Sequence, residues 1–248
     1  MIKISIITAV RNNRDNIKQC IESVRSQTYH NIEHIVIDGN STDGTKEIIS
    51  GHQNQISEWI SEPDKSIYDA LNKGINLATG DVIGFLHSDD LFDNDSIVEK
   101  IALTFTQTHC DAVYGDLLYV SKADPSKVIR YWKSSPFNVK KFRYGWMPAH
   151  PTLFMRKTIY DQYGLFDLQY KIAADYDLML RTVGSGRLAC EYLPEIITRM
   201  RVGGASNKSL KNIWRKSSED LHAIRKNKTG GFYTLALKNL SKLGQFLH

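Results

Sequence analysis

Through its first ninety residues the chain alternates between strand-like and helix-like segments, and this alternation is the feature that most constrains its fold. Residues 2–9 form a continuous apolar run rich in β-branched side chains, as expected of a strand buried on both faces. Within 13–27, Ile17, Ile21 and Val24 recur at the spacing of one helix face. Further strands are expected at 32–37, 56–60 and 82–86, and further helices at 45–50 and 66–78. Such alternation predicts an open, mostly parallel α/β sheet.

Beyond residue 93 the pattern is less regular. We expect a helix at 96–106, then a hairpin of strands 111–120 and 127–132 around the turn sequence Ala-Asp-Pro-Ser. The remaining expected elements are a strand at 148–155, a helix at 175–183, an extended segment at 188–200, and helices at 207–226 and 232–247.

The net charge of +5 is concentrated near the C-terminus. From residue 208 onward nine lysines and arginines face two acids, whereas the rest of the chain is close to neutral. A basic segment of this kind suits an anionic membrane surface, nucleic acid or a solvated helix face. We expect this basic segment to bind an anionic membrane surface and not nucleic acid. The alternatives are that it packs on the body of the protein or on the second subunit of a homodimer. The last helix is expected to place Leu235, Leu237, Leu240, Leu243, Phe246 and Leu247 on one side and Lys238 and Lys242 on the other.

The cellular compartment can be inferred from the lack of membrane-spanning, signal-peptide and disulfide patterns in the sequence. Its apolar runs are too short to cross a bilayer, and the N-terminal run has no signal-peptide cleavage pattern. Three scattered cysteines, Cys20, Cys110 and Cys190, favour a reducing environment over a disulfide framework. We therefore expect a cytoplasmic protein, held peripherally at the inner face of the plasma membrane.

Polar side chains follow four successive strands at the point where each is expected to end. They are Thr8, Arg11 and Asn12 after the first strand, residues 38–41 after the second, 62–65 after the third and 87–90 after the fourth. In an open parallel sheet, ligands bind beyond the carboxyl ends of the strands. Any one of these groups alone would be a solvated loop, but the four together favour a binding site.

The stretch Gly-Phe-Leu-His-Ser-Asp-Asp at 84–90 ends a buried strand in two adjacent carboxylates. Such carboxylates repel each other and resist burial unless a cation lies in front of them. Asp89 and Asp90 could hold a hard divalent cation that stays open to phosphate, and Asp38 could accept hydrogen bonds from a base or ribose. These features fit a nucleotide diphosphate. The absence of a Walker A loop and of Gly-x-Gly-x-x-Gly argues against a phosphate-loop NTPase and a nicotinamide enzyme.

An ordered set of motifs resembles glycosyltransferase family 2. They are SIITAVRNN, IVIDGNSTDGT, SEPDKSIYDALNKGINLATGDVIGFLHSDD and AADYDLMLR, and the resemblance runs from about residue 3 to about 204. The likeness is greatest to the bacterial branch that builds surface polysaccharides. It implies the GT-A fold, with a catalytic domain at 1–206, a nucleotide-binding half at 1–93, an acceptor half at 94–206 and a basic helical extension at 207–248.

The resemblance also implies roles for individual residues. Nucleotide contacts would come from Thr8, Ala9, Arg11, Asp38, Glu62, Asp64 and Lys73. Asp90 and Arg201 would lie beside the donor sugar or diphosphate, and Asp89 would hold a divalent cation, Mn²⁺ or Mg²⁺. His150 would lie on the acceptor side, with a packed structural histidine as the alternative. Asp175 would be the catalytic base.

Three positions keep alternatives. His87 stands where the family often has an acid, so it is either a further metal ligand or a half-buried histidine at a strand end. Asp175 could be a helix N-cap instead of the base. Asp177 is the second choice for the base.

The expected function is inverting transfer of a hexosyl or N-acetylhexosaminyl group from a nucleotide sugar, a UDP-sugar, during cell-surface polysaccharide synthesis. The acceptor would be a glycan or a sugar carried on polyprenyl diphosphate. Two alternatives stay open: a sugar-nucleotide pyrophosphorylase, and a non-catalytic subunit that binds nucleotide sugars.

Overall fold

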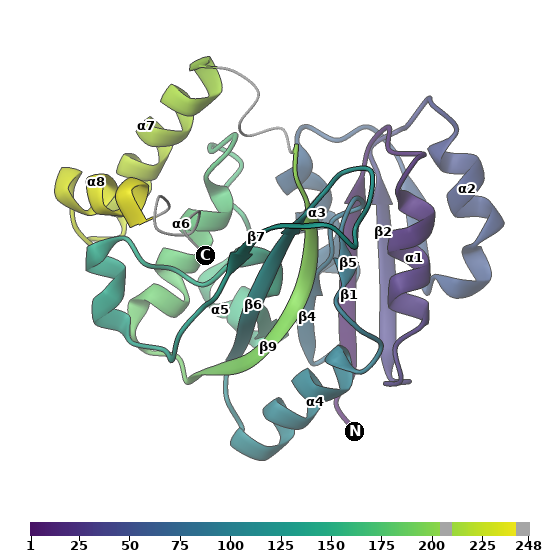
Figure 1. The fold of residues 1–248 in the computed structure, drawn as a ribbon, viewed down its shortest axis with the longest axis horizontal. Coiled ribbons are helices and arrows are strands. Elements are labelled where there is room, and N and C mark those ends of the chain that lie inside the picture. The colour runs from purple at the N-terminus through teal and green to yellow at the C-terminus, as the bar shows by residue number, and fades with distance from the viewer. Residues whose placement is uncertain (204–209, 242–248) are drawn as a thin grey trace.

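The computed structural model describes residues 1–203 and 210–241. One sheet runs through this part of the chain, and helices lie on both of its faces (Figure 1). Its strand order is β3-β2-β1-β4-β8-β6-β9-β5, and β7 pairs with β6. The expected open α/β sheet flanked by helices is confirmed.

The first half of the sheet is parallel and consists of the four expected strands. They are β1 (Ile4–Val10), β2 (Ile32–Asp38), β3 (Glu58–Ser61) and β4 (Val82–Phe85). Side chains of β1 alternate between the two faces. Ile4 and Ile6 pack towards α1 (Ile17–Arg25) and α4 (Ile97–Thr108), and Val10 packs near α2 (Thr45–Gly51). Ile7 and Ala9 pack on the other face.

Helix α3 (Ile67–Leu77) covers that other face and begins at the carboxyl edge of the sheet. Ser66 caps it, because its Oγ accepts a hydrogen bond from the backbone N–H of Asp69 at 3.2 Å. Gly74 allows the helix to lie close to β1, since a Cβ there would lie 2.4 Å from Cγ2 of Ile7. The amino end of α3 is thereby fixed beside the strand ends.

The second half of the sheet is mixed. β6 (Ala112–Val120) pairs antiparallel with β7 (Val128–Trp132) and β8 (Phe154–Arg156), and parallel with β9 (Cys190–Arg201), which pairs with β5 (Leu91–Phe92). The expected hairpin is the β6–β7 pair. β8 joins the two halves because it also pairs with β4. Gly84 makes room at this joint, where a Cβ would lie 2.1 Å from the ring of Phe154.

The segment 148–155 differs from the expected strand. His150–Thr152 forms a short 3₁₀ turn, and only Phe154–Arg156 is a strand. Pro151 has no N–H to give to a ladder, and the Thr152 hydroxyl donates to the carbonyl of Ala149 at 2.8 Å, which closes the turn. The turn directs His150 towards the strand ends.

Two helices follow. α5 (Lys157–Tyr163) was not expected, and it is only two turns long. α6 (Ala174–Arg181) lies where the sequence predicts a helix at 175–183, but ends earlier, before a 3₁₀ turn at Val183–Ser185.

The C-terminal helices α7 (Leu210–Lys226) and α8 (Phe232–Ser241) lie at the end of the molecule away from β2 and α2 (Figure 1). They pack on α6 and on the 3₁₀ segment Val139–Tyr144. The expectation that Lys238 faces away from the apolar side of α8 is wrong. Lys238 is only 3% exposed, because its ammonium group pairs with the buried carboxylate of Asp220 at 2.8 Å. Residues 204–209 and 242–248, with Lys242, Leu243, Phe246 and Leu247, lie outside the described residues.

Across 1–203 and 210–241, no helix has both the length and the apolar character needed to cross a membrane.

Candidate active site

A cavity of about 800 Å³ opens where β1 and β4 end, and α3 and α6 supply other parts of its wall. Nine residues to which the family resemblance assigns a role line it: Ala9, Arg11, Asp64, His87, Asp89, Asp90, His150, Asp175 and Arg201. The carboxyl ends of the strands therefore bring together residues from both halves of the chain, as expected for this sheet type.

The two adjacent carboxylates of the 87–90 loop lie in different environments. Asp90 is 1% exposed, and its Oδ1 accepts a hydrogen bond from the backbone N–H of Arg201 at 3.1 Å. Burial, and then the neighbouring Asp89, raises the pKa of Asp90 well above its usual value. Asp89 is only half-buried and forms no ion pair with any described residue. Asp89 is therefore the carboxylate that faces a ligand, while Asp90 ties the loop to β9.

His87 is neutral at physiological pH. Burial, followed by the nearby His150, lowers the pKa of His87 to about 4. The two imidazole rings meet edge to face with centroids 5.9 Å apart. Among the described residues Nδ1 of His87 has no hydrogen-bond partner. A neutral ring of this kind can ligate a metal or hydrogen-bond a ribose, so both roles considered for His87 remain predictions.

Asp175 lies in the first turn of α6 and is held from two sides. Its Oδ2 is 3.2 Å from Nδ1 of His150, and its Oδ1 is 3.3 Å from the hydroxyl of Tyr68. The single hydroxyl proton of Tyr68 is shared between Asp175 and the closer carbonyl of Ile172, at 2.6 Å. Burial, with Asp175 as the second cause, raises the pKa of Tyr68, so this phenol stays protonated and acts as a donor. The carboxylate is oriented while part of it stays accessible from the cavity.

The two alternatives for Asp175 can be compared with this geometry. The N-cap of α6 is Ala173, so Asp175 does not occupy the capping position. Asp177 is fully buried and does not line the cavity. Its carboxylate accepts from Arg181 at 2.8 Å and from Asn227 at 3.0 Å. Asp177 therefore braces α6 against α7.

Thr8 and Asp38, two predicted nucleotide contacts, do not line the cavity. The hydroxyl of Thr8 is buried and lies 3.1 Å from Nε2 of His34. The carboxylate of Asp38 is 0% exposed and accepts hydrogen bonds from the backbone and hydroxyl of Ser41 and from the hydroxyl of Ser61 at 2.5 Å. Asp38 thus shapes the loops that follow β2 and β3.

Glu62 and Lys73 lie just outside the cavity and pair with each other. The ammonium group of Lys73 is 2.7 Å from the Glu62 carboxylate and 2.6 Å from that of Asp64. Of the three, only Asp64 lines the cavity. Lys73 therefore holds Asp64 in place at the cavity wall.

Arg201 remains a predicted diphosphate contact, but its guanidinium group already has partners. It donates to the carbonyl of Asp89 and to the side chain of Gln19. Arg201 is 3% exposed. Arg201 therefore fixes the position of Asp89 through the backbone carbonyl of that residue.

Several functional candidates escaped the sequence analysis. They are Tyr68, which contacts Asp175, and the cavity-lining residues Lys122, Lys171, Asn212 and Arg215. The helical spacing of 66–78 already placed Tyr68 on a helix, but not beside Asp175. Nothing in the local sequence of the other four marks them, because loop and tail segments meet the cavity only in the folded chain.

The donor set at this site fits a divalent cation that is shared with a ligand. Among the described residues no group of three or more His, Cys, Asp or Glu side chains forms a closed metal site. Asp89 nevertheless faces the cavity without an ion pair, and Oδ2 of Asp90 beside it is buried without a partner among the described residues. Mg²⁺ is commonly bound through one or two carboxylates together with water and substrate phosphates. Asp89 suits that arrangement.

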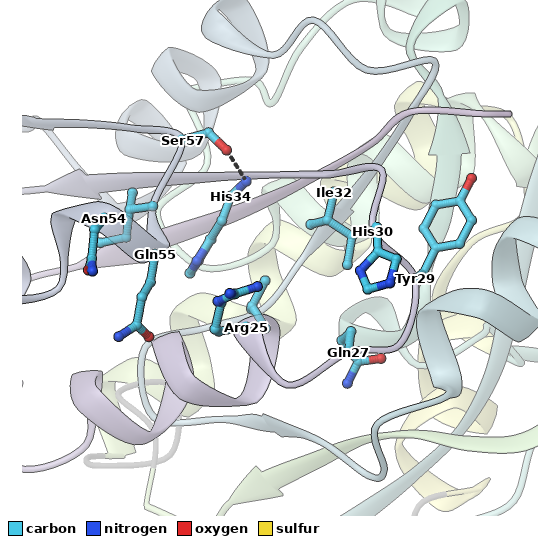
Figure 2. Close-up of a pocket in the computed structure, with 11 residues that line it drawn as sticks. Arg25, Gln27, Tyr29, His30, Ile32, His34, Asn54, Gln55 and Ser57 are labelled. Carbon is cyan, nitrogen blue, oxygen red and sulfur yellow. Dashed lines mark hydrogen bonds between the residues drawn. The ribbon is translucent and has the colours of Figure 1, made fainter.

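A second cavity of about 440 Å³ lies at the amino ends of β2 and β3 (Figure 2). Figure 2 shows His34 within it, its backbone N–H bonded to the hydroxyl of Ser57 at 3.1 Å. Its lining includes Arg25 and His30 but no carboxylate. It therefore offers neither the metal ligand nor the base found in the larger cavity.

Solved structures with the same fold include complexes with nucleotide sugars. Staphylococcus aureus TarS in complex with UDP-GlcNAc superimposes with a TM-score of 0.70 at 17% identity, over 91% of this chain and 65% of that one. Mannosyltransferase PcManGT from Pyrobaculum calidifontis, in complex with GDP-Man and Mn²⁺, gives a TM-score of 0.68 at 16% identity, over 99% of this chain and 72% of that one. The chain spans 43% of a longer TarS chain. The fold is that of the GT-A glycosyltransferases.

Sequence similarity identifies the family to which the chain belongs, which similarity of fold alone does not. The family described as "Glycosyl transferase family 2" matches residues 5–164. An uncharacterized glycosyltransferase of Mycobacterium tuberculosis is 34% identical over 190 residues, which cover 76% of this chain and 70% of the relative. A PGL/p-HBAD biosynthesis glycosyltransferase of Mycobacterium bovis is 27% identical over 208 residues, covering 82% and 78%. The chain belongs to glycosyltransferase family 2.

Proposed function

We propose that this protein is an inverting, metal-dependent glycosyltransferase that moves a sugar from a UDP-sugar to a glycan or a lipid-linked sugar. One observation carries the proposal: Asp175, an oriented carboxylate, lines the same cavity as Asp89, a carboxylate with no ion pair among the described residues. A base on one side and an anchor for a diphosphate on the other are what direct displacement at an anomeric carbon requires.

Asp175 acts as the general base. A sugar hydroxyl is a weak nucleophile until its proton is taken up in the transition state, a contribution worth about 10²–10⁴-fold in rate. His150 and Tyr68 hold the two carboxylate oxygens, so the proton arrives at a fixed position. Attack from the side of Asp175, opposite the departing diphosphate, inverts the anomeric carbon.

Asp89 is the residue that would hold Mg²⁺ or Mn²⁺, with His87 as a further ligand. A bound divalent cation would neutralise the negative charge of the leaving nucleoside diphosphate. The backbone carbonyl of Asp89 is fixed by Arg201, and the loop is further held by Asn13, whose amide donates to the hydroxyl of Ser88 at 2.9 Å. The chain therefore presents Asp89 in one orientation.

The nucleotide would occupy the part of the cavity lined by Ala9, Arg11 and Asp64. The TarS complex contains UDP-GlcNAc and the PcManGT complex contains GDP-Man, so both nucleotides fit this fold. We favour uridine because two TarS structures with this fold contain UDP-GlcNAc and UDP. The transferred group would be a hexosyl or N-acetylhexosaminyl unit.

The acceptor would carry an anionic group. Lys122, Lys171 and Arg215 line the cavity, and none of the three pairs with a carboxylate among the described residues. Unpaired cations at a cavity wall favour binding of phosphate or diphosphate. A glycan on polyprenyl diphosphate, used in cell-surface polysaccharide synthesis, meets this requirement.

A turnover screen tests the proposal. The intact protein would be incubated with UDP-, GDP- and dTDP-sugars and a polyprenyl-diphosphate sugar, with Mn²⁺, with Mg²⁺ or with EDTA. Release of UDP that depends on metal and acceptor is expected, and the anomeric configuration of the product would be read by NMR. Formation of UTP and sugar 1-phosphate from a UDP-sugar, when pyrophosphate is added as the second substrate, would instead indicate pyrophosphorylase chemistry. Tight donor binding with no turnover would indicate a binding subunit.

We also propose peripheral association with an anionic membrane through α7 and α8. Ile213, Trp214, Phe232, Tyr233 and Leu240 are all large apolar side chains that are exposed on these helices. Tryptophan and tyrosine favour the interfacial region of a bilayer, and nearby basic residues add about 1 kcal/mol each at an anionic surface. The packed Lys238 does not take part.

Flotation with phosphatidylglycerol vesicles checks this association. The Trp214→Ser and combined Phe232→Ser, Tyr233→Ser variants should float less than the wild type. Leu103→Ser on α4 is the matched control, since Leu103 is 50% exposed on a helix far from the tail. Equal flotation of all four proteins would contradict the proposal.

A further inference from the structure

The carboxylate of Glu219, on α7, holds the backbone that leads into α6. One oxygen, Oε2, accepts hydrogen bonds from three consecutive backbone N–H groups. The distances are 3.1 Å to Lys171, 2.8 Å to Ile172 and 3.0 Å to Ala173. Three donors converging on one charged oxygen fix this stretch of chain more firmly than any single neutral hydrogen bond would.

One of these donors, Ala173, is the N-cap of α6, where a helix has N–H groups without internal partners, and Lys171 and Ile172 are the two residues before it. The N-cap residue, Ala173, has no side chain that could satisfy them. Glu219 supplies the missing acceptor from 46 residues further along the chain. A negative charge at this position also interacts favourably with the helix dipole.

Other contacts make α7 a support for the whole segment around α6. The Tyr170 hydroxyl lies 2.9 Å from Nδ1 of His222, and the Lys226 ammonium group lies 2.8 Å from the Asp167 carboxylate. Asn227, just beyond α7, donates to Asp177. The segment 167–177 is thus bound to α7 on both sides of Glu219's contacts.

We infer that Glu219 is a positioning residue for the base. Asp175 follows Ala173 by two residues, and Ile172, one of the N–H donors, also accepts from Tyr68 through its carbonyl. Glu219 therefore fixes the backbone on which Asp175 is mounted, while Tyr68 and His150 fix its side chain. This inference rests on the proposed function, because it assigns Asp175 the role of base.

Two variants at Glu219 test the inference in the full-length protein. Glu219→Ala removes the acceptor, and kcat should fall by about 100-fold, the cost of a displacement of about 1 Å at a reacting group. Glu219→Gln keeps an acceptor oxygen without the charge and should recover part of this loss. Donor Kd, measured by calorimetry, should stay within twofold of wild type in both variants.

Two controls separate positioning from general damage. Ser218→Ala changes the exposed neighbour of Glu219 and should match wild type. Ile101→Ala removes a buried side chain of α4 and lowers stability at a site remote from α6. If the melting point of Ile101→Ala falls as far as that of Glu219→Ala while its kcat stays at the wild-type value, loss of stability does not explain the lower turnover of Glu219→Ala.

Hydrogen exchange gives a readout that does not need turnover. The amides of 171–173 should exchange faster in Glu219→Ala, and those of α4 should not change. Unchanged exchange at 171–173, or a kcat equal to wild type, would overturn the inference. A wild-type protein inactive with every donor and acceptor would instead overturn the proposed function, and faster exchange would then leave Glu219 with a structural role alone.

Discussion

Nδ1 of His150 lies 3.2 Å from Oδ2 of Asp175. The two residues come from different elements, a 3₁₀ turn and the first turn of α6, and both face the same cavity. A protonated Nδ1 would donate to the carboxylate and fix its orientation, while the Tyr68 hydroxyl does the same for the other oxygen. This arrangement supports the proposed role of Asp175 as the general base.

Asp175→Asn should lower turnover by about 10²–10⁴-fold, because the amide keeps the shape of the side chain but cannot take up the acceptor proton. Donor binding should be unchanged, since Asp64 and Asp89 are untouched. Steady-state kinetics beside a donor titration would measure both. Asp161→Asn, at an exposed position on α5, is the matched control. Turnover within a few-fold of wild type would mean that Asp175 is not the base.

Asp89→Asn should abolish the metal dependence of donor binding. The substitution removes the charge at the one acid of the pair that faces the cavity without an ion pair among the described residues. Calorimetry with UDP, with and without Mn²⁺, would show the loss as equal affinities under the two conditions. Asp95→Asn, an exposed acid beyond β5, should keep the difference. An Asp89→Asn protein in which Mn²⁺ still strengthens UDP binding would refute the metal role.

His34→Gln should flatten the dependence of stability on acidic pH. Burial lowers the pKa of His34 to about 4 in the folded protein, whereas an unfolded histidine titrates near 6.5. The unfolded chain thus binds the proton first, so the free energy of unfolding falls as pH drops from about 6.5 towards 4, by up to about 3 kcal/mol. Urea titrations at several pH values measure this. His30→Gln, exposed in the preceding loop, should behave as wild type, and equal slopes for all three proteins would contradict the prediction.

Lys238→Met should destabilise the protein by about 3–5 kcal/mol, because it leaves the buried carboxylate of Asp220 without its cation. The pair is 3% and 2% exposed, and burial lowers the pKa of Lys238 despite the nearby Asp220. Lys127→Met breaks a lysine–aspartate pair that is 76% and 41% exposed, so it should lower stability far less. Urea unfolding compares the two variants. Similar losses for both would show that burial does not govern this interaction.

The sequence predicts the first half of the fold well because that half depends on local patterns. Its strands are continuous apolar runs, and its helices show regular spacing. The second half depends on long-range pairing: β8 is short, α5 has two turns, and residues 148–155 owe their turn to Pro151 and Thr152. Such short elements are stabilised by their neighbours and leave little periodicity in the sequence.

The candidate site was predictable as a set of strand ends, but not in its individual contacts. Thr8 belongs to the same face of β1 as Ile4 and Ile6, so alternation along the strand already directs it under α1 and away from the cavity. Asp38 serves its own loop, as acids at strand ends often do. Glu219 and Arg215 reach the cavity region only through the packing of α7, which no local pattern reports.

The dependence of α6 on α7 also bears on how the protein is made. The ribosome releases the chain from its amino end, and domains often begin to fold during synthesis. Residues 1–163 contain every strand of the sheet except β9, together with the proposed nucleotide contacts Ala9, Arg11 and Asp64, whereas the acceptor for the amino end of α6 lies on α7, which is synthesised later. A nascent chain would therefore acquire its nucleotide site first and its catalytic competence only once α7 has emerged.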